Sequence, residues 1–459
     1  MPRSQSHPLR SSQFPSCKKS AASLAAALGV SKFSMLLDCS CTVLKRSAAL
    51  FPEIIMSFPD HLHQWFHHCK YLRWPLRVLL FSVSLALVFG LWQAPVVQRG
   101  AIATTELRGV WMTDIGAALM YYTTRLDEAI AHLAQLRLNT LYPSVWNGGT
   151  TLHPSAIASR ASGIQPHPLI ARLLQPDVLV GLVKQAHRQQ LRLIPWFEYG
   201  LMIPPQSAIA RQHPDWLTVT RSGKQQDEVN HQAWLNPLHP QVQQFLTDLI
   251  VEVVQRYSID GIQLDDHFGW PIEFGYDAET IRRYQAEHQG QAPPIDPTNP
   301  EWMAWRAAQV TQLMRKIAEA VRAARPTAVV SLSPNLPDFA YRSYLQDWPR
   351  WVELGLLDEV VVQVYRSQQS TLEAELAIDK LQQLRSRVPI AIGLYTGPML
   401  EAKSVQHIRQ QVNSVRQAKY AGVSFFCWET TFWWFKKSET DSVNQEFDRL
   451  FPQASRALE

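Results

Sequence analysis

Cysteine is scarce in most of this sequence of 459 residues. Four of the five cysteines precede residue 100, which leaves Cys427 alone in the remainder of the chain. One cysteine can form neither an intrachain disulfide framework nor a cysteine-based zinc site. Cys427 also lies in an apolar stretch, and no G-x-S-x-G motif is present. Serine or cysteine nucleophilic chemistry is therefore disfavoured.

An excess of positive charge is also missing beyond the first 99 residues. The whole chain carries a formal net charge of +5, but residues 1–99 hold 11 Lys and Arg against 3 Asp and Glu. The remaining 33 basic residues face 36 acidic ones, so the rest of the chain has a net charge of −3. A slightly acidic body gives no electrostatic footprint for nucleic acid, and we expect no nucleic-acid partner.

No apolar run reaches the ~20 residues that span a bilayer. The longest covers residues 78–92, which carry no charge; Lys70, Arg73 and Arg77 precede it, and Pro95 follows. A basic segment, a short apolar run and a breaker are typical of a signal peptide or signal-anchor. We therefore expect export to the cell envelope, with the protein either secreted or held to the membrane through residues 78–92.

The position of this signal suggests how the chain is divided. Met56 would begin a signal of ordinary size, whereas residues 1–55 lack any sustained hydrophobic period. We predict that residues 1–55 are a non-native or disordered extension. Residues 56–100 would be the signal peptide or signal-anchor, and residues 105–455 the folded domain.

Beyond residue 105 a short apolar strand followed by an amphipathic helix recurs eight times. The predicted strands cover residues 107–114, 139–147, 192–200, 260–268, 328–335, 358–366, 389–397 and 422–430. The predicted helices cover residues 125–138, 177–190, 240–257, 305–324, 345–356, 371–387, 404–420 and 441–451. Eight such units in about 350 residues are typical of an α/β protein with the (β/α)8 TIM-barrel fold, preceded here by a basic leader. A doubly wound sheet is disfavoured because no G-x-G-x-x-G follows the first strand.

Polar and aromatic residues stand at the C-terminal ends of the predicted strands. In a barrel these ends meet at one face, where barrel enzymes build their active sites. Amides and arginine can bond hydroxyls, and aromatic faces can stack on pyranose rings, so the combination predicts a sugar site. The candidate substrate-binding residues are Trp111, Asp114, Trp146, Asn147, Trp196, Tyr199, His267, Asn335, Gln363, Tyr365, Arg366, Tyr395 and Trp428.

Glycoside cleavage normally needs two carboxyl groups, and four acidic residues at this face are candidates: Glu198, Asp265, Asp266 and Glu429. We expect Asp265 to point inward as a catalytic carboxylate and its neighbour Asp266 to point toward the following loop. Glu429 and Glu198 compete for the role of general acid. Each of these residues could instead hold a sugar hydroxyl or orient a loop. Adjacent acids also permit a route in which a 2-acetamido group of the substrate attacks the anomeric carbon.

Two other functions fit parts of the pattern. Asp265, Asp266 and His267 offer oxygen and imidazole ligands, as in a metal-dependent deacetylase or hydrolase. A barrel metallohydrolase would usually add further histidines at strand ends, which are absent here, so we expect neither a metal nor another cofactor. A membrane-anchored barrel that binds glycans without cleaving them is the other alternative.

Several segments together resemble the bacterial glycosyl-hydrolase-like 10 family. They are LRGVWMTD, LNTLYPSVWNGGTTLHPS, IPWFEYGLM, WLNPLHPQVQQF, YSIDGIQLDDHFGWP, SLSPNLPDFAYRSYLQDW, DEVVVQVYR and GVSFFCWET, within residues 107–434. The resemblance implies a glycosidase barrel with Asp265 and Asp266 among its polar site residues. It also implies an envelope glycan as substrate, with the glycan strands of peptidoglycan the first choice. No protein partner is indicated.

Overall fold

The computed structural model describes residues 81–83, 106–163, 177–397, 402–433 and 436–452. The chain divides into two compact units, residues 1–92 and 93–459, and the folded domain lies in the second. The predicted extension 1–55 and all but residues 81–83 of the predicted signal segment lie outside the described residues. In the part of the chain that is described, no helix is long and apolar enough to cross a membrane.

The second unit contains a parallel sheet that closes on itself. Its order is β5-β2-β1-β13-β12-β11-β10-β9-β6. The two ends of this order, β5 and β6, belong to one predicted strand that is interrupted at Ile194 and Pro195. Because β5 pairs with β2 and β6 pairs with β9, the sheet is continuous through this interruption. The eight predicted strands and the barrel fold are therefore confirmed.

The strands of the barrel begin and end close to the predicted bounds. They are β1 (Leu107–Met112), β2 (Thr140–Pro143), β5 (Arg192–Leu193), β6 (Trp196–Phe197), β9 (Gly261–Asp265), β10 (Val329–Ser333), β11 (Glu359–Gln363), β12 (Ile390–Tyr395) and β13 (Gly422–Phe426). Proline lacks the N–H that a sheet ladder uses, which explains the ends at Pro143 and the break at Pro195.

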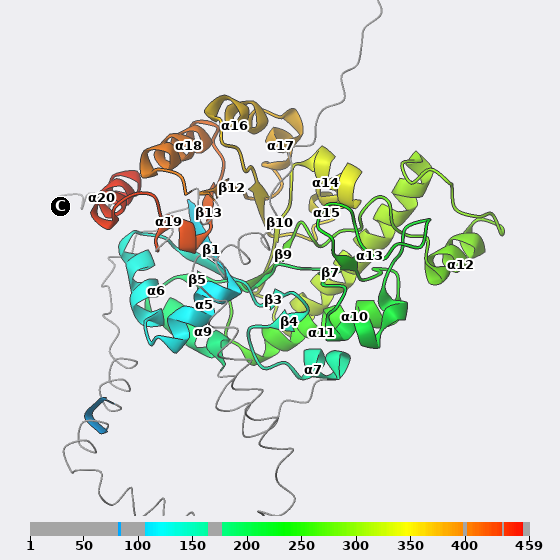
Figure 1. Ribbon diagram of the computed structural model, residues 1–459. Coiled ribbons are helices and arrows are strands. Elements are labelled where there is room, and N and C mark those ends of the chain that lie inside the picture. The colour runs from blue at the N-terminus through cyan, green and yellow to red at the C-terminus, as the bar shows by residue number, and fades with distance from the viewer. Residues whose placement is uncertain (1–80, 84–105, 164–176, 398–401, 434–435, 453–459) are drawn as a thin grey trace, which may run out of the picture. The chain divides into compact units, whose positions relative to one another are not determined.

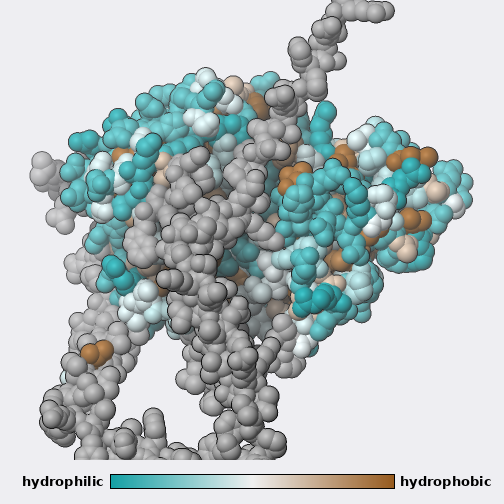
Figure 2. Space-filling model, viewed as in Figure 1, coloured by the Kyte–Doolittle hydropathy of each residue, from teal (hydrophilic) through white to brown (hydrophobic). Residues whose placement is uncertain are grey.

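Helices surround the strands, as Figure 1 shows. Those that confirm the prediction are α6 (Leu126–Gln135), α9 (Val178–Arg188), α11 (Pro240–Arg256), α13 (Pro300–Ala324), α18 (Val405–Gln417) and α20 (Thr440–Leu450). In α11 the buried positions recur every three or four residues, among them Val242, Leu246, Leu249 and Val253. This is the apolar stripe of a helix with one face on a core. Hydrophilic residues cover the visible outer surface of α18 and its neighbour α16 (Figure 2).

The sequence reading was incomplete in three places. A helix not predicted, α5 (Asp114–Tyr122), follows β1 directly, because the Thr113 side chain caps its first turn by accepting from Gly116 N–H. The helix predicted over 345–356 is preceded by α14 (Pro337–Tyr344) and is itself the short α15 (Trp348–Glu353). The helix predicted over 371–387 is split into α16 (Gln369–Leu376) and α17 (Asp379–Leu384). At that split the carbonyl of Leu376 accepts from the Tyr420 hydroxyl and Gln382.

The remaining elements lie in the segments that follow the strands. They are β3 (Trp146–Asn147), β4 (Thr150–Thr151), α7 (Ala156–Ser162), β7 (Met202–Ile203), α10 (Ala208–Gln212), the 3-10 helix η1 (Pro214–Trp216), β8 (Ala233–Trp234), α12 (Ala278–Glu287) and α19 (Trp428–Thr431). All except β3, which ends the second predicted strand, and α19 lie in the three long inserts after the second, third and fourth predicted strands, which are residues 148–176, 201–236 and 269–304.

A buried polar network lies inside the barrel around Glu359 of β11. Its carboxylate accepts from the Tyr142 hydroxyl at 2.7 Å and the Ser331 hydroxyl at 3.0 Å, and pairs with Arg192 at 2.8 Å. The Ser331 hydroxyl in turn accepts from Gln263, whose carbonyl accepts from the Trp111 indole N–H at 2.7 Å. Side chains of six strands are thereby joined at the centre of the barrel.

Trp111 can occupy this interior only because β12 carries a glycine opposite it. A Cβ atom on Gly393 would lie 2.9 Å from the Trp111 ring, closer than real Cβ contacts. The same indole lies 6.4 Å from Trp196 and 6.2 Å from Phe426, between ring centroids. The barrel is thus filled with side chains and is not a pore.

Replacing Glu359 by Gln tests the network. The change leaves an amide facing Arg192 and removes the charge that this guanidinium pairs with, so the free energy of unfolding should fall by about 1–3 kcal/mol. Urea unfolding would measure it. Glu353→Gln, whose side chain is 46% exposed in a pair with Arg350, is the matched control and should change stability by less than about 0.5 kcal/mol. Equal effects of the two changes would contradict a structural role for the network.

Candidate active site

Two carboxyl groups come from neighbouring strands at the C-terminal face of the barrel. Phe197 of β6 pairs with Leu264 of β9, so the next residues, Glu198 and Asp265, follow in the same register. Adjacent strands lie ~4.8 Å apart, and residues in register point to the same face. The sequence alone predicted both residues at this face, and the pairing of the strands brings them together.

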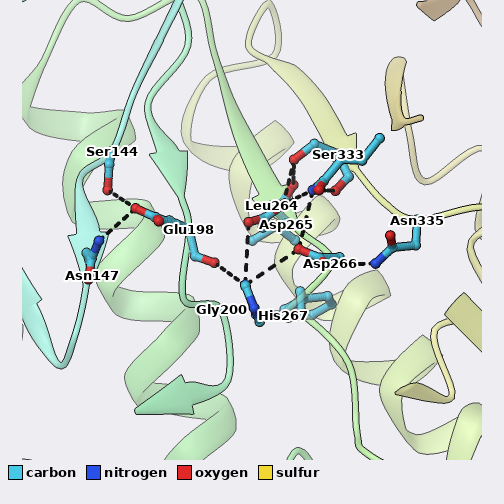
Figure 3. Close-up of polar contacts among 12 residues, drawn as sticks. Ser144, Asn147, Glu198, Gly200, Leu264, Asp265, Asp266, His267, Ser333 and Asn335 are labelled. Carbon is cyan, nitrogen blue, oxygen red and sulfur yellow. Dashed lines mark hydrogen bonds and ion pairs between the residues drawn. The ribbon is translucent and has the colours of Figure 1, made fainter. Parts of the chain in front are cut away.

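Glu198 is held in a buried position by two donors from the chain after β2. Its Oε2 atom accepts from the Ser144 hydroxyl and the Asn147 amide, each at 2.8 Å. Asn147 was predicted as a site residue, whereas Ser144 was not, although it lies inside the predicted strand 139–147. The side chain of Glu198 is thereby fixed (Figure 3).

The carboxylates of Asp265 and Asp266 converge, contrary to the expectation that they point in different directions. Gln363 Nε2 lies 2.6 Å from Oδ1 of Asp265 and 3.3 Å from Oδ1 of Asp266. The Ser333 hydroxyl donates to Asp265 at 2.8 Å, and Asn335 donates to Asp266 at 2.7 Å. Asp265 has only 3% of its side chain exposed and Asp266 19%, so Asp266 is the more accessible of the two.

His267 lies against both aspartates and against the chain that carries Glu198. Its Nδ1 atom is 3.0 Å from the carbonyl oxygen of Glu198 and 3.5 Å from one oxygen each of Asp265 and Asp266. All three are acceptors, so Nδ1 carries a proton. Figure 3 shows His267 in this central position.

The backbone after β6 must come very close to the backbone after β9 for this contact to form. Gly200 has φ +49°, and a Cβ atom there would lie 2.7 Å from the Phe268 nitrogen. Glycine is therefore required at this position by both the conformation and the space. Beyond the turn, the Gln346 amide donates to the carbonyl oxygens of Asp265 and Phe268 at 3.0 and 2.9 Å. Gln346 lies in the segment between α14 and α15, where the sequence pattern gave no signal for it.

Burial and neighbouring charges move the pKa values of these groups away from their ordinary values. It raises the pKa of Glu198 to about 8, with a smaller contribution from the negative charge of Asp114. Burial also raises the pKa of Asp265 to about 7, assisted by the charge of Asp266 and opposed by His267. Burial alone would lower the pKa of His267, but the charges of Asp266 and Asp265 outweigh it and raise that pKa to about 10. At neutral pH the site therefore holds a protonated Glu198 and an imidazolium.

Asp265, Asp266 and His267 form the one cluster of potential metal ligands in the described part of the chain. One ligand atom each of Asp265, Asp266 and His267 lies within 4.8 Å of the others. The Nδ1 atom that faces the two carboxylates also faces the carbonyl of Glu198, so it carries a proton and has no free lone pair for a metal. The geometry therefore fits an ion pair better than a metal centre.

Aromatic residues at the C-terminal ends of β11, β12 and β13 form a second wall of the site. The ring of Tyr365 lies 5.3 Å from that of Tyr395 and 5.6 Å from that of Phe426, and all three are partly exposed. Burial, followed by the charges of Asp265 and Asp266, raises the pKa of Tyr365, which places this wall beside the aspartates. Phe426 was not predicted, because it ends an apolar strand and has no polar signal. Arg366 pairs with Glu375 at 2.8 Å and donates to the carbonyl of Tyr365.

Glu429 is tied to the start of α5. Its Oε1 atom accepts from the Thr113 hydroxyl at 2.7 Å and the Thr113 backbone N–H at 3.1 Å, and a Cβ atom on Gly116 would overlap it. Burial raises its pKa. Asp114 is the first residue of α5, and burial raises its pKa too. Thr113 lies in the first predicted strand but was not predicted as a site residue.

The predicted tryptophans and Tyr199 are mostly enclosed. Trp111 and Trp196 fill the barrel interior, as described above. Trp146 is fully buried, donates to the carbonyl of Gly200 and packs on Phe245 of α11 at 5.8 Å. Trp428 is also buried and stacks on Trp433 at 5.0 Å. The ring of Tyr199, buried as well, lies 6.0 Å from that of His267.

A closed (β/α)8 barrel with three clustered carboxyl groups and an aromatic wall at the strand ends defines a hydrolase-type barrel with a sugar-compatible site. Residues 106–416 match the model of the Glycosyl hydrolase-like 10 family, and the chain belongs to this family.

The chain is also similar in sequence to bacterial glycosyl hydrolases and in fold to a solved glycoside hydrolase domain. The chain is 26% identical over 347 residues to "Glycosyl hydrolase DigH" of Escherichia coli (strain K12), covering 64% of this chain and 75% of that protein. It is 22% identical over 327 residues to "Glycosyl hydrolase YngK" of Bacillus subtilis (strain 168), covering 63% of this chain and 60% of that one. Among solved structures, the PgaB (BpsB) glycoside hydrolase domain from Bordetella bronchiseptica has a TM-score of 0.59 at 14% identity. That match covers 76% of this chain and 100% of that domain, and it shows the shared fold.

Glu198→Gln should make the protein more stable at alkaline pH. Because folding raises this pKa from 4.5 to about 8, the folded state keeps a proton that the unfolded state has lost, and wild-type stability falls as pH rises through that window. Glutamine cannot ionise. The free energy of unfolding of the variant, relative to wild type, should rise on the order of 3 kcal/mol between pH 4.5 and pH 9.

Denaturant unfolding at the two pH values would measure this difference. Glu128→Gln on α6, with 60% of its side chain exposed, is the control and should show no such change with pH. A flat difference for Glu198→Gln would mean that Glu198 ionises normally.

His267→Gln should move the acid side of any pH–activity profile upward by about one unit or more, because Asp265 loses the cation that lowers its pKa. His187→Gln is the matched control, since His187 contacts Asp260 at 2.9 Å at the start of the same strand. Rates measured from pH 4 to pH 9 would decide. An unshifted profile would show that His267 does not control the ionisation of Asp265.

Proposed function

We propose that this protein is a glycoside hydrolase that acts on a cell-envelope glycan, with the glycan strands of peptidoglycan as the first candidate. One observation carries the proposal: a protonated carboxyl group, Glu198, lies beside Asp265, whose charged form the His267 imidazolium favours, and Asp266 converges on the same place. Glycoside cleavage uses carboxyl groups with different pKa values, one as the general acid and the other as the nucleophile or base.

In the proposed reaction Glu198 is the general acid. Its pKa of about 8 keeps it protonated at neutral pH, so it can donate that proton to the glycosidic oxygen as the bond to the anomeric carbon breaks. The Ser144 and Asn147 donors bond to Oε2 only, and the proton belongs on the other oxygen, Oε1. Glu429 is less suited to this role because its Oε1 is bonded to Thr113 and its Oε2 is buried.

The aspartate pair supplies the negative charge on the other side of the reacting bond. Asp266, the more exposed of the two, would face the anomeric carbon, while Asp265 and His267 hold it in place. Either Asp266 bonds to that carbon, or it holds a 2-acetamido group of the substrate that does so. In both routes water then attacks the anomeric carbon and gives its proton to the Glu198 carboxylate, which regenerates the acid.

Two features support a glycan of the envelope as the substrate. The partly exposed rings of Tyr365, Tyr395 and Phe426 stand beside the aspartates, where a pyranose ring could stack on them. The basic and apolar pattern before residue 93 has the form of an export signal, which would deliver the protein to the envelope. The relatives named above are described as glycosyl hydrolases, which agrees with this activity.

Reducing-end release from purified peptidoglycan glycan strands, with and without stem peptides, tests the proposal on the full chain. Wild type should release reducing ends. Asp265→Asn, Asp266→Asn and Glu198→Gln should each lower the rate by about 100-fold or more, because each removes a group that acts in the transition state. Glu429→Gln is the comparison and should retain more activity than Glu198→Gln.

The opposite order of the two glutamate variants would assign the acid to Glu429. Binding of strands without any release by wild type would favour a non-catalytic glycan-binding barrel. Loss of release on adding a chelator, restored by a divalent metal, would favour the metal-dependent hydrolase.

A further inference from the structure

The helix α14 is fastened at both ends to the turn that carries the aspartates. Before the helix, Asn335 donates to Asp266 at 2.7 Å; after it, Gln346 donates to the carbonyl of Asp265 at 3.0 Å. The backbone N–H of Trp270 also donates to the carbonyl of Tyr344, the last residue of the helix. The position of α14 relative to Asp266 is therefore fixed by three contacts with one short turn.

Two of the three aromatic rings on this helix, Phe339 and Tyr344, form a pair that none of the contacts above requires. Phe339 is 47% exposed, and its ring centroid lies 6.1 Å from that of the partly exposed Tyr344. The Tyr344 ring lies 5.7 Å from the buried Trp234, which lies 6.2 Å from His267. A continuous row of rings thus leads from the centre of the site out to Phe339. Burial, followed by the charge of Asp266, raises the pKa of Tyr344, which places that ring beside the aspartates.

A loop from the insert after the third strand completes this wall. The buried Asp227 accepts from the Val229 and Asn230 backbone N–H groups and from the Trp234 indole at 2.8 Å. This arrangement brings the Asn230 side chain within hydrogen-bonding reach of the Tyr344 side chain. The neighbouring Val229 is 71% exposed.

We propose that Phe339, Tyr344 and Asn230 form a sugar-binding subsite next to the reacting bond, made by α14 and the loop that contacts it. The ligand class is a pyranose unit of the glycan chain: its C–H face stacks on the Phe339 and Tyr344 rings, and its hydroxyls meet the Asn230 amide. The proposal rests on the proposed function and adds to it. The substrate is then an oligosaccharide that extends past the cleaved bond, along the row of rings that leads out to Phe339.

A single exposed ring on a helix is common and needs no function. The contacts around this one distinguish it, because α14 is tied to the turn that carries the aspartates and Tyr344 is tied to a loop of the insert after the third strand. Both devices remove conformational freedom from the rings before a ligand binds, which reduces the entropy lost on binding.

Cleavage rates on substrates of different lengths test the subsite. Phe339→Ala should lower kcat/KM about tenfold on long glycan strands, mainly through KM, and leave the rate on the shortest oligosaccharide that wild type cleaves unchanged. Phe339→Trp, which keeps a ring, should restore most of the loss. Ile295→Ala, which removes a side chain that is 68% exposed on the insert after the fourth strand, is the matched control and should change neither rate.

An equal loss on short and long substrates, or no loss on either, would overturn the subsite. Its failure can be separated from a failure of the proposed function by measuring binding of length-fractionated strands to the uncleaving Asp265→Asn variant. If wild type cleaves no glycan, weaker binding of long strands after adding Phe339→Ala would still support the subsite. Unchanged binding would overturn it.

Discussion

The contact between His267 and the chain after β6 is the constraint on which the rest of the site depends. The imidazole touches the carbonyl oxygen of Glu198 and both aspartates, so one ring fixes the distance between the acid and the pair that would act with it. The contact requires the two strand ends to approach closely, and Gly200 permits that approach because no side chain would fit there. Without this approach the carboxyl groups would still stand at the mouth, but their mutual geometry would not be set.

The barrel contains two groups of buried acidic side chains that differ in how far their negative charge is compensated. Glu359, deep inside, has an arginine partner and two hydroxyl donors, so its charge is compensated. Among the described residues, Glu198, Asp265 and Asp266 make no ion pair with lysine or arginine, and one histidine stands against all of them. Undercompensated buried acids reduce the stability of the folded state, and proteins retain such groups mainly where function requires them. The contrast between the two groups is the physical reason to place the chemistry at the mouth.

The sequence was sufficient for the barrel and for most of the acids, because both depend on local patterns. Alternating apolar strands and amphipathic helices predict the fold, and residues at strand ends are brought together by the register of a parallel barrel. It was not sufficient for contacts made between segments far apart in the chain. The bond from Glu429 to Thr113 and those from Gln346 to the turn after β9 join residues that no spacing relates. The convergence of Asp265 and Asp266 also depends on Gln363, which lies about a hundred residues away.

The segments that follow the strands supply the binding surfaces that the strands of the barrel cannot supply alone. The barrel alone places acids and small polar donors at its mouth, which suffices to activate one bond.

Recognition of a chain of sugars needs surfaces that extend outward from that bond on either side. The rings at the ends of β11, β12 and β13 supply one such surface. A second such surface is made by α14 together with the loop around Asp227. These two segments follow different strands, yet both are anchored to the turn that holds Asp266 or to a ring beside it. Anchoring at that turn keeps the outer surface in register with the reacting centre, so a sugar bound on α14 would be placed relative to the aspartates by the same bonds that hold the aspartates themselves.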